Sequence, residues 1–241
     1  MEKKPGKKNF LSKGFNRLVE ARWFFAMSAS MVATITGISL TFGINSCRDN
    51  QRKNEEKKKS MLQAVDNLAD RFQDAEEWIS ALRRQSDVYN YTDSVYFSGG
   101  HLTDSICEKF RYTMPFVKIS AFDHEFEKVF RGSYQLWQLQ NNTDSLAFYI
   151  CLCYDGLNIV EKTCEELTEG MLEKIGEVNS RKSFNRLPPR EWTVTLLEDP
   201  NFQYYMSVRK VKAEIAGQIL RMAKKDFDEN VKWRAAEILK K

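Results

Sequence analysis

Two histidines, and the carboxylates around one of them, are the residues of this chain that most resemble a metal site. His124 lies in the segment Asp123–Glu127, which holds three carboxylates beside one imidazole. A zinc site on a helix needs a second ligand four residues away or ligands from elsewhere, and His101 beside a Gly-Gly pair is typical of a loop. Acidic residues are also favoured in the first turn of a helix. We therefore interpret the segment as a helix start and predict no bound metal.

Motifs for covalent or phosphate chemistry are missing from the sequence. It has no glycine-rich phosphate loop, no nucleophile elbow and no zinc-protease motif. Two histidines in such contexts do not support a Ser-His-Asp arrangement. We therefore predict no catalytic residues, no cofactor and no enzymatic activity.

Five cysteines, at positions 47, 107, 151, 153 and 164, are the remaining candidates for chemistry. Cys151 and Cys153 are two residues apart, so on a helix their side chains point to nearly opposite sides and cannot bridge each other. This is also not the spacing of a Cys-x-x-Cys redox motif. We interpret the cysteines as separate buried residues. A disulfide from Cys107 to Cys151, Cys153 or Cys164 is the alternative in an oxidising compartment.

The first element that the sequence predicts is formed by an uncharged stretch, Trp23–Ile44. A helix rises about 1.5 Å per residue and the hydrocarbon core of a bilayer is about 30 Å thick, so the stretch is long enough to cross once. We predict one transmembrane helix at residues 23–45. Two alternatives are a cleaved secretory signal, for which the leader of residues 1–22 is too long, and a lipoprotein signal with an acylated Cys47.

Positive charge is concentrated on both sides of this span. Residues 1–22 carry seven Lys or Arg against two Glu, a net charge of +5, whereas the whole chain carries +4. The remainder is close to neutral, which argues against a nucleic-acid partner and for anionic headgroups beside the basic tail. The other flank holds six basic residues between positions 48 and 59, so the positive-inside rule leaves a small margin. We expect a single-pass protein of the cytoplasmic membrane, with the tail in the cytoplasm and the C-terminal domain in the periplasm.

The span also carries a strip of small residues. Ala29, Ala33 and Gly37 recur every four residues, which would let two such helices approach closely. Chance in a span rich in Ala, Ser and Gly explains the pattern equally well. Self-association through this strip is therefore one of two open interpretations.

Residues 46–86 are predicted to form a charged helical stalk that continues the span. Apolar residues recur in it at spacings of four and three over three heptads, which is typical of an a/d seam. The seam consists of Met61, Val65, Leu68, Phe72, Ala75, Ile79 and Leu82. Its partner is either another copy of the chain, with Val65, Leu68, Phe72 and Ile79 as contacts, or the chain's own C-terminal helix. We favour the second.

Residues 87–241 are predicted to form an antiparallel helical domain with a long C-terminal helix. The stretch 87–100 is expected to be a loop, and Ser105 and Asp123 are expected to cap the helices that follow. A further helix runs from Ser145 to about residue 178, and residues 192–196 are expected to be extended. The fold class is therefore all-α, with one N-terminal transmembrane helix that continues into the stalk.

The last helix begins at Asp199-Pro200, with an acceptor at the N-cap and Pro at the first helical position. The amphipathic pattern predicts one apolar face for it. This face consists of Val208, Val211, Ile215, Ile219, Met222, Ala223, Phe227, Val231, Ala235 and Ile238.

A family resemblance joins these features. The chain resembles an uncharacterised family of small bacterial single-span membrane proteins. The features that carry the resemblance are the basic leader, the span ending near Gly-Ile-Asn, the charged stalk, the aromatic segment Phe126–Tyr134 and the Leu197–Phe202 segment. The resemblance covers most of the chain, which differs in having a more polar span. It implies this architecture and an envelope location, and it transfers no catalytic residues.

An anchor and a stalk without recognisable chemistry predict a membrane-anchored helical interaction or scaffold protein of the bacterial envelope. It would bind an unknown protein partner or a second copy of itself. The alternative is a single-span sensor or signal-transmitting accessory protein, whose basic tail would dock a cytoplasmic partner. A tail of residues 1–22 is long enough for docking but not for catalysis.

Overall fold

All regular elements of the described chain are helices, which confirms the all-α class. A computed structural model describes the backbone of residues 9–115, 117, 119–139, 145–182 and 187–239. Within these ranges it describes side chains from residue 49 onward, except at positions 139, 179, 181, 182, 238 and 239. The chain divides into two compact units, one ending at Lys57 and one starting at Lys58, and helix α1 (Asn9–Phe97) contributes to both.

The predicted transmembrane segment, residues 23–45, belongs to α1, but its side chains are outside the described ones. In the part of the chain that the structure describes, no helix has a stretch of sufficient length and hydrophobicity to cross a bilayer. The span and its strip of Ala29, Ala33 and Gly37 stay predictions.

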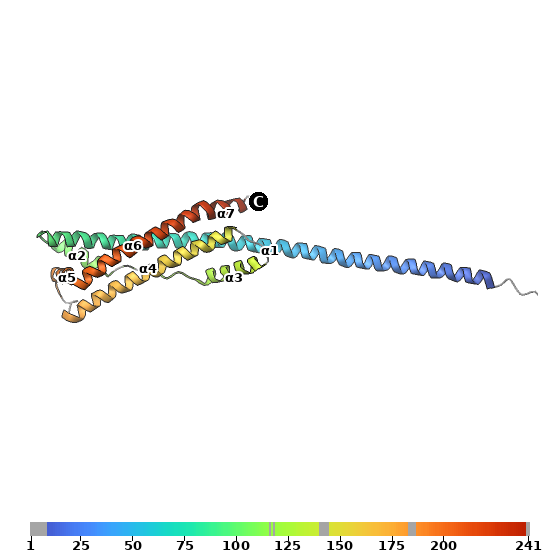
Figure 1. Cartoon of the computed structure of the whole chain (residues 1–241), viewed down its shortest axis with the longest axis horizontal. Helices are drawn as coiled ribbons and strands as arrows, with labels where there is room; N and C mark the ends of the chain where they lie inside the picture. The colour runs from blue at the N-terminus through green and yellow to red at the C-terminus, as the bar shows by residue number, and fades with distance from the viewer. Residues whose placement is uncertain (1–8, 116, 118, 140–144, 183–186, 240–241) are drawn as a thin grey trace, which may run out of the picture. The chain divides into compact units, whose positions relative to one another are not determined.

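The second unit contains the end of α1 and all of the later helices. These are α2 (Asp104–Thr113), α3 (Glu125–Leu139), α4 (Ser145–Lys182), α5 (Pro189–Leu197), α6 (Pro200–Asp226), the π-helical segment η2 (Phe227–Lys232) and α7 (Trp233–Leu239). In this unit α4 and α6 pack along each other, and α2 packs against α5 (Figure 1).

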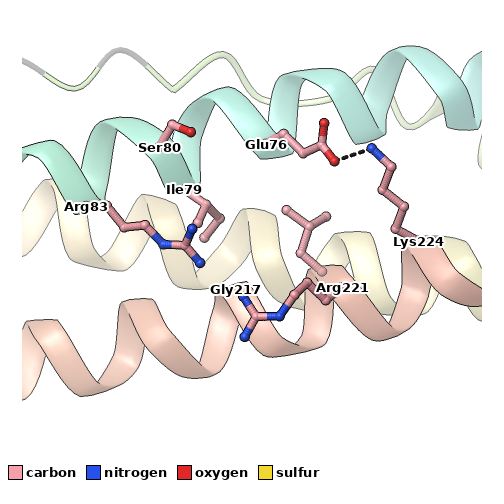
Figure 2. A pocket seen from close by; sticks show the side chains of 8 residues that line it. Glu76, Ile79, Ser80, Arg83, Gly217, Arg221 and Lys224 are labelled. Atoms are coloured by element: carbon pink, nitrogen blue, oxygen red, sulfur yellow. Dashed lines mark hydrogen bonds and ion pairs between the residues drawn. The ribbon is translucent and has the colours of Figure 1, made fainter.

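Glycines mark close approaches between the long helices. A Cβ on Gly156 of α4 would lie 2.8 Å from the Cβ of Ala223, and a Cβ on Gly170 would lie 3.0 Å from the ring of Tyr205. The order of these pairs means that α4 and α6 run antiparallel. On the other side of α6, the buried Gly217 faces α1, where Ile79 lies (Figure 2).

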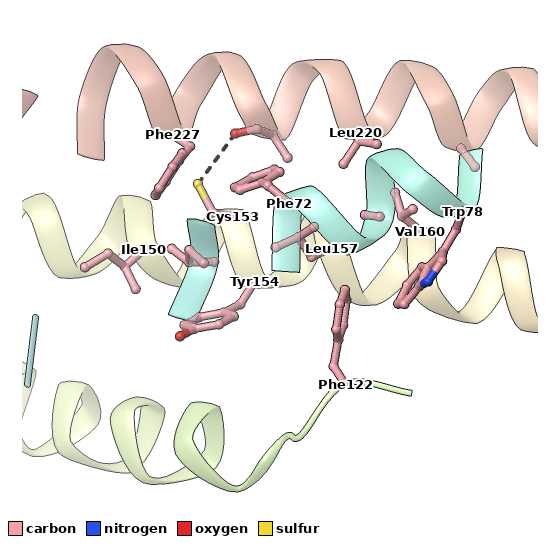
Figure 3. Packing of buried hydrophobic residues seen from close by; sticks show 14 of the residues in the cluster. Phe72, Trp78, Phe122, Ile150, Cys153, Tyr154, Leu157, Val160, Leu220 and Phe227 are labelled. Atoms are coloured by element: carbon pink, nitrogen blue, oxygen red, sulfur yellow. Dashed lines mark hydrogen bonds between the residues drawn. The ribbon is translucent and has the colours of Figure 1, made fainter. Parts of the chain in front are cut away.

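The larger core is built from α1, α3, α4, α6 and η2, with Phe122 contributed by the segment before α3 (Figure 3). The ring centroids of Phe72 and Phe227 are 5.0 Å apart, and those of Trp78 and Phe122 are 4.7 Å apart. Full burial of an aromatic or branched aliphatic side chain contributes about 1.5–3 kcal/mol. These contacts therefore hold the end of α1 against the later helices.

The stalk seam packs inside this core. Leu68, Phe72 and Ile79 are buried, and Val65 packs against them from its edge. The partner of the seam within the described chain is therefore the chain's own later helices, including the C-terminal one.

The loop predicted from residue 87 is wrong for positions 87–97, because α1 continues to Phe97. Polar residues of this stretch are accommodated in the helix; the Thr92 hydroxyl donates to the Val88 carbonyl four residues earlier. Tyr89 meanwhile packs into a second, smaller core, 6.0 Å from the ring of Phe202. Only the turn at Gly99 and Gly100, with Gly99 at a φ of 74°, is as expected.

The extended stretch predicted at residues 192–196 is also wrong, because these residues belong to α5. Pro189 occupies the first turn, where a missing N–H costs nothing, and the Thr193 hydroxyl donates to the Pro189 carbonyl at 2.8 Å. Trp192 and Leu196 lie one turn apart and are both buried in the second core. The burial of these side chains outweighs the β propensity of the sequence.

Side-chain caps fix three of the helix starts. Asp123 and Asp199 each accept from a backbone N–H two residues on at 2.9 Å, which confirms both predicted starts. The cap of α2 is Thr103 and not Ser105, because the Thr103 hydroxyl accepts from the N–H three residues later at 3.4 Å.

The predicted apolar face of the last helix is only partly correct. Phe227, Val231 and Ala235 are buried as expected, whereas Val211 and Met222 are more than half exposed. The buried face of α6 instead consists of Phe202, Met206, Arg209, Ala213, Ala216, Gly217, Leu220 and Ala223. Small residues allow the close approach of α1 and α4, so the more hydrophobic stripe is left facing outward.

Candidate functional site

The first candidate is the cluster around His124, the residue that the sequence suggested as a metal ligand. His124 Nδ1 lies 3.2 Å from Glu127 Oε2, and its Nε2 lies 3.0 Å from Glu161 Oε2 on α4. Asp123 caps α3 and does not join these contacts through its carboxylate. The segment is therefore a helix start, as its acidic composition indicated, and His124 bridges two helices.

Glu127 is the centre of the cluster and is almost completely buried. Its carboxylate accepts hydrogen bonds from Arg71 of α1 at 2.7 Å, Arg131 of α3 at 2.8 Å and Asn158 of α4 at 2.8 Å. Burial alone would raise the pKa of Glu127, but hydrogen bonds from Arg71, Asn158, Arg131 and His124 lower it from 4.5 to about 2. The carboxylate stays ionised and joins three helices.

Arg71 is the buried cation of this cluster. Its guanidinium carbon lies 4.8 Å from the ring centroid of Phe122 and 5.0 Å from that of Tyr154, so two aromatic faces enclose it. It also donates to the carbonyl of Asp123. The charge is thus paired with Glu127, hydrogen-bonded and stacked, as a buried charge requires.

The arrangement around Glu127 is suited to holding helices together. The carboxylate oxygens that could bind a cation already accept from arginine, asparagine and histidine groups. Among the described side chains, no group of three or more His, Cys, Asp or Glu residues has the arrangement of a metal site. Spacing alone could not identify this network, because Arg71 and Asn158 lie far from Glu127 in the sequence.

The described cysteines are free thiols, and all four are buried, as predicted. Burial raises the pKa of Cys153 and of Cys164 to about 12 and that of Cys151 to about 11. A thiol with so high a pKa has almost no thiolate at neutral pH, and the thiolate is the nucleophile. These three residues are therefore packing residues; Cys47 lies outside the described side chains.

The second candidate is an exposed apolar surface, which we name the α4–α6 face. It consists of Phe148, Leu152 and Ile159 on α4 and Val211, Ile215 and Met222 on α6. Their exposed fractions range from 40% for Leu152 to 70% for Met222. Isolated exposed apolar residues are ordinary, but a group on two packed helices needs an explanation.

These residues gather around one helix–helix contact. The Cγ2 of Ile219 lies 4.0 Å from the position of a Cβ on Gly156. Leu152 and Ile159 are four residues before and three after Gly156, and Ile215 and Met222 have the same spacing around Ile219. Residues three and four apart share one face of a helix. The apolar side chains of α4 and α6 therefore border the same contact.

Charged residues flank the α4–α6 face. Lys212 and Asp226 lie seven residues before and after Ile219, which places them on one side of α6. Lys212 pairs with Glu166 at 3.7 Å, and both side chains are about half exposed. A surface pair of this kind contributes about 0–1 kcal/mol, so its lysine can exchange partners at little cost.

The predicted contact residues of the stalk do not belong to this surface. Leu68, Phe72 and Ile79 are buried, and Val65 is half-buried at the core. The α4–α6 face was missed because the sequence assigned Val211, Ile215 and Met222 to the buried side of the last helix. Comparison of the whole chain with protein-family models, with curated proteins and with solved structures finds no match.

Proposed function

We propose that this protein is a membrane-anchored helical interaction protein of the bacterial envelope that pairs with a second copy of itself through the α4–α6 face. The observation that carries the proposal is the exposure of six large apolar side chains on two packed helices. Covering such a surface removes apolar area from water, which drives most protein association. Soluble domains rarely leave a large group of apolar side chains uncovered on two neighbouring helices.

A second copy is the occupant favoured by the flanking charges. In an antiparallel pairing with the two-fold axis near Ile219, Lys212 of each copy lies opposite Asp226 of the other. Ile215 likewise lies opposite Met222. A two-fold interface must be complementary to itself, and oppositely charged flanking residues select the partner and its register.

The anchor strengthens this pairing. Residues 23–45 are the predicted span, and the basic residues 1–22 would contact anionic headgroups on the cytoplasmic side. Copies confined to one membrane meet at a higher effective concentration than free copies, so a modest contact suffices. The helical domain would act in the periplasm.

The oligomeric state of the full chain in mild detergent tests the proposal. The detergent-corrected mass from light scattering should correspond to two copies at micromolar concentration. Met222→Glu places a charge in the centre of the face and should shift the mass to one copy. Val129→Glu makes the same kind of change on α3, at an equally exposed position outside the face, and should leave two copies.

Two results would contradict the proposal. One is a wild-type mass of a single copy at all accessible concentrations. The other is a dimer that survives Met222→Glu but dissociates on Ala33→Leu, because the contact would then lie in the span.

Orientation has a separate test. A phosphatase fused after Lys241 should be active, since that enzyme requires the non-cytoplasmic side. An inactive fusion that is present at normal amounts would place the domain in the cytoplasm and overturn the periplasmic location.

A further inference from the structure

A basic groove lies between α1 and α6, on the side of α6 that contacts α1. Its volume is about 320 Å³, and Arg83 of α1 and Arg221 of α6 line it on either side of Gly217 (Figure 2). All of these residues belong to the second unit of the chain. Figure 2 shows Arg83 extending from α1 toward α6, and Arg221 lying along α6 beside Gly217.

Gly217 brings the two arginines together. A Cβ at this position would lie 3.0 Å from Nη2 of Arg83 and 3.8 Å from Nη1 of Arg221. The two nitrogens are therefore at most about 7 Å apart, close enough for like charges to repel one another appreciably even through water. Because glycine has no side chain, the space between the guanidinium groups stays open.

No carboxylate of the described residues neutralises these two arginines. Among the described residues, neither guanidinium takes part in an ion pair. The acidic residue of the lining, Glu76, is instead bound by Lys224. The four charged side chains of the groove therefore carry a net charge of about +2 at neutral pH.

The groove also holds a neutral donor. Ser80, on α1 between Glu76 and Arg83, lines it and is exposed. A hydroxyl can donate to an oxyanion that the two arginines hold. Arginine binds phosphate through bidentate, charge-assisted hydrogen bonds of about 2.8 Å. Two arginines on opposite sides of a tetrahedral anion can therefore bind it together.

We propose that this groove binds a phosphate group, with Arg83 and Arg221 as its charged ligands and Ser80 as a further donor. A phosphate carries between one and two negative charges at neutral pH and so matches the pair of arginines better than a single carboxylate does. The phosphate is that of a small soluble compound or of a lipid headgroup, since the chemistry of recognition is the same. The site lies apart from the α4–α6 face and does not depend on self-association.

Titration of the purified full chain in detergent tests the site. Inorganic phosphate is titrated calorimetrically in a chloride buffer of constant ionic strength. Arg83→Gln and Arg221→Gln should each raise the dissociation constant at least tenfold. Arg84→Gln removes the same charge from the next position of α1, outside the groove lining, and should change it less than twofold.

A second measurement separates loss of binding from loss of folding. The thermal midpoint in chloride should be unchanged or slightly higher in Arg83→Gln and Arg221→Gln, because both side chains are exposed and repel each other. Phosphate should raise the midpoint of the wild type and of Arg84→Gln, and leave the midpoints of the two groove variants unchanged. An equal effect of phosphate on all four proteins would refute the site.

Short-chain phosphatidic acid distinguishes the two sources of phosphate. Binding of both inorganic phosphate and this lipid, lost in the same two variants, supports recognition of the phosphate group itself. Binding of the lipid alone, again lost in both variants, supports a headgroup site. If neither compound binds, or if Arg84→Gln weakens binding as much as the groove variants do, the proposal is wrong.

Discussion

Glu127→Gln is the substitution that should test the packing of the second unit most sharply. It removes the negative charge from a side chain that is 4% exposed and leaves Arg71, which is 3% exposed, without a counter-charge. Gln is nearly the same size as Glu, so no cavity forms. One end of the new amide is also a donor that faces the donors of Arg71 and Arg131.

The magnitude follows from the pKa of Glu127. A carboxyl whose pKa falls from 4.5 to about 2 on folding contributes about 3 kcal/mol to the free energy of unfolding at neutral pH. Removing one partner of a buried pair costs about 3–5 kcal/mol, which agrees. Because the folded-state pKa is the lower one, the contribution is complete above about pH 5 and is lost as the pH falls toward 2.

The assay is urea unfolding of the full chain in mild detergent, followed by circular dichroism at 222 nm from pH 7 to pH 2. Glu127→Gln should be less stable than the wild type by about 3 kcal/mol at pH 7, and the difference should shrink steadily below pH 5. Glu125→Gln changes an exposed carboxylate two residues away and should have an effect below about 0.5 kcal/mol. A loss no greater than that of Glu125→Gln, or a loss that persists at pH 2, would refute this reasoning.

Two further substitutions test the helix contacts and caps. Gly156→Ala should destabilise the domain by about 1–3 kcal/mol, because its Cβ would lie 2.8 Å from that of Ala223. Gly176→Ala, which meets nothing within 4 Å in the same helix, should stabilise by up to about 1 kcal/mol, and equal effects of the two in thermal unfolding would contradict the packing. Asp199→Ala should cost about 1 kcal/mol, because two N–H groups at the start of α6 lose their acceptor; a neutral result would remove the capping role.

The sequence contained enough local information for the helical class and for two of the helix starts. Asp199 is the N-cap of α6, and Asp123 accepts from the N–H of the first residue of α3; both acceptor roles depend only on neighbouring backbone groups. The stalk seam was equally readable, since spacings of four and three place Leu68 and Phe72 on one face. These features are set within a few turns of chain.

The errors occurred where distant contacts outweigh local preference. Thr92 lies in the stretch predicted to be a loop, yet it belongs to α1, and Tyr89 three residues earlier packs against Phe202. Besides Phe202, Met206 and Leu220, the buried side of α6 contains four small residues and the fully buried Arg209, and a hydrophobicity pattern does not select that arginine. Arg209 is hydrogen-bonded to Gln85 of α1, a contact across most of the domain's sequence.

The candidate sites could not be predicted from the sequence either, because they depend on contacts between distant residues. The Glu127 network joins α1, α3 and α4, and the α4–α6 face appears only once the helices have taken their places. Sequence reasoning could identify that Val211, Ile215 and Met222 share one face of a helix. Which side that face points to depends on Gly156 and Gly217, where neighbouring helices approach α6.

Charge exchange at the α4–α6 face is the most direct test of self-association. Lys212→Glu should place like charges opposite each other twice in the dimer and raise its dissociation constant at least tenfold, measured by light scattering in detergent. The double variant Lys212→Glu with Asp226→Lys restores opposite charges and should return the dissociation constant to within about threefold of the wild type. The control Lys210→Glu changes a lysine exposed on another side of α6 and should have little effect on the dissociation constant. A double variant as weak as Lys212→Glu alone, or a dimer indifferent to all three changes, would contradict the account.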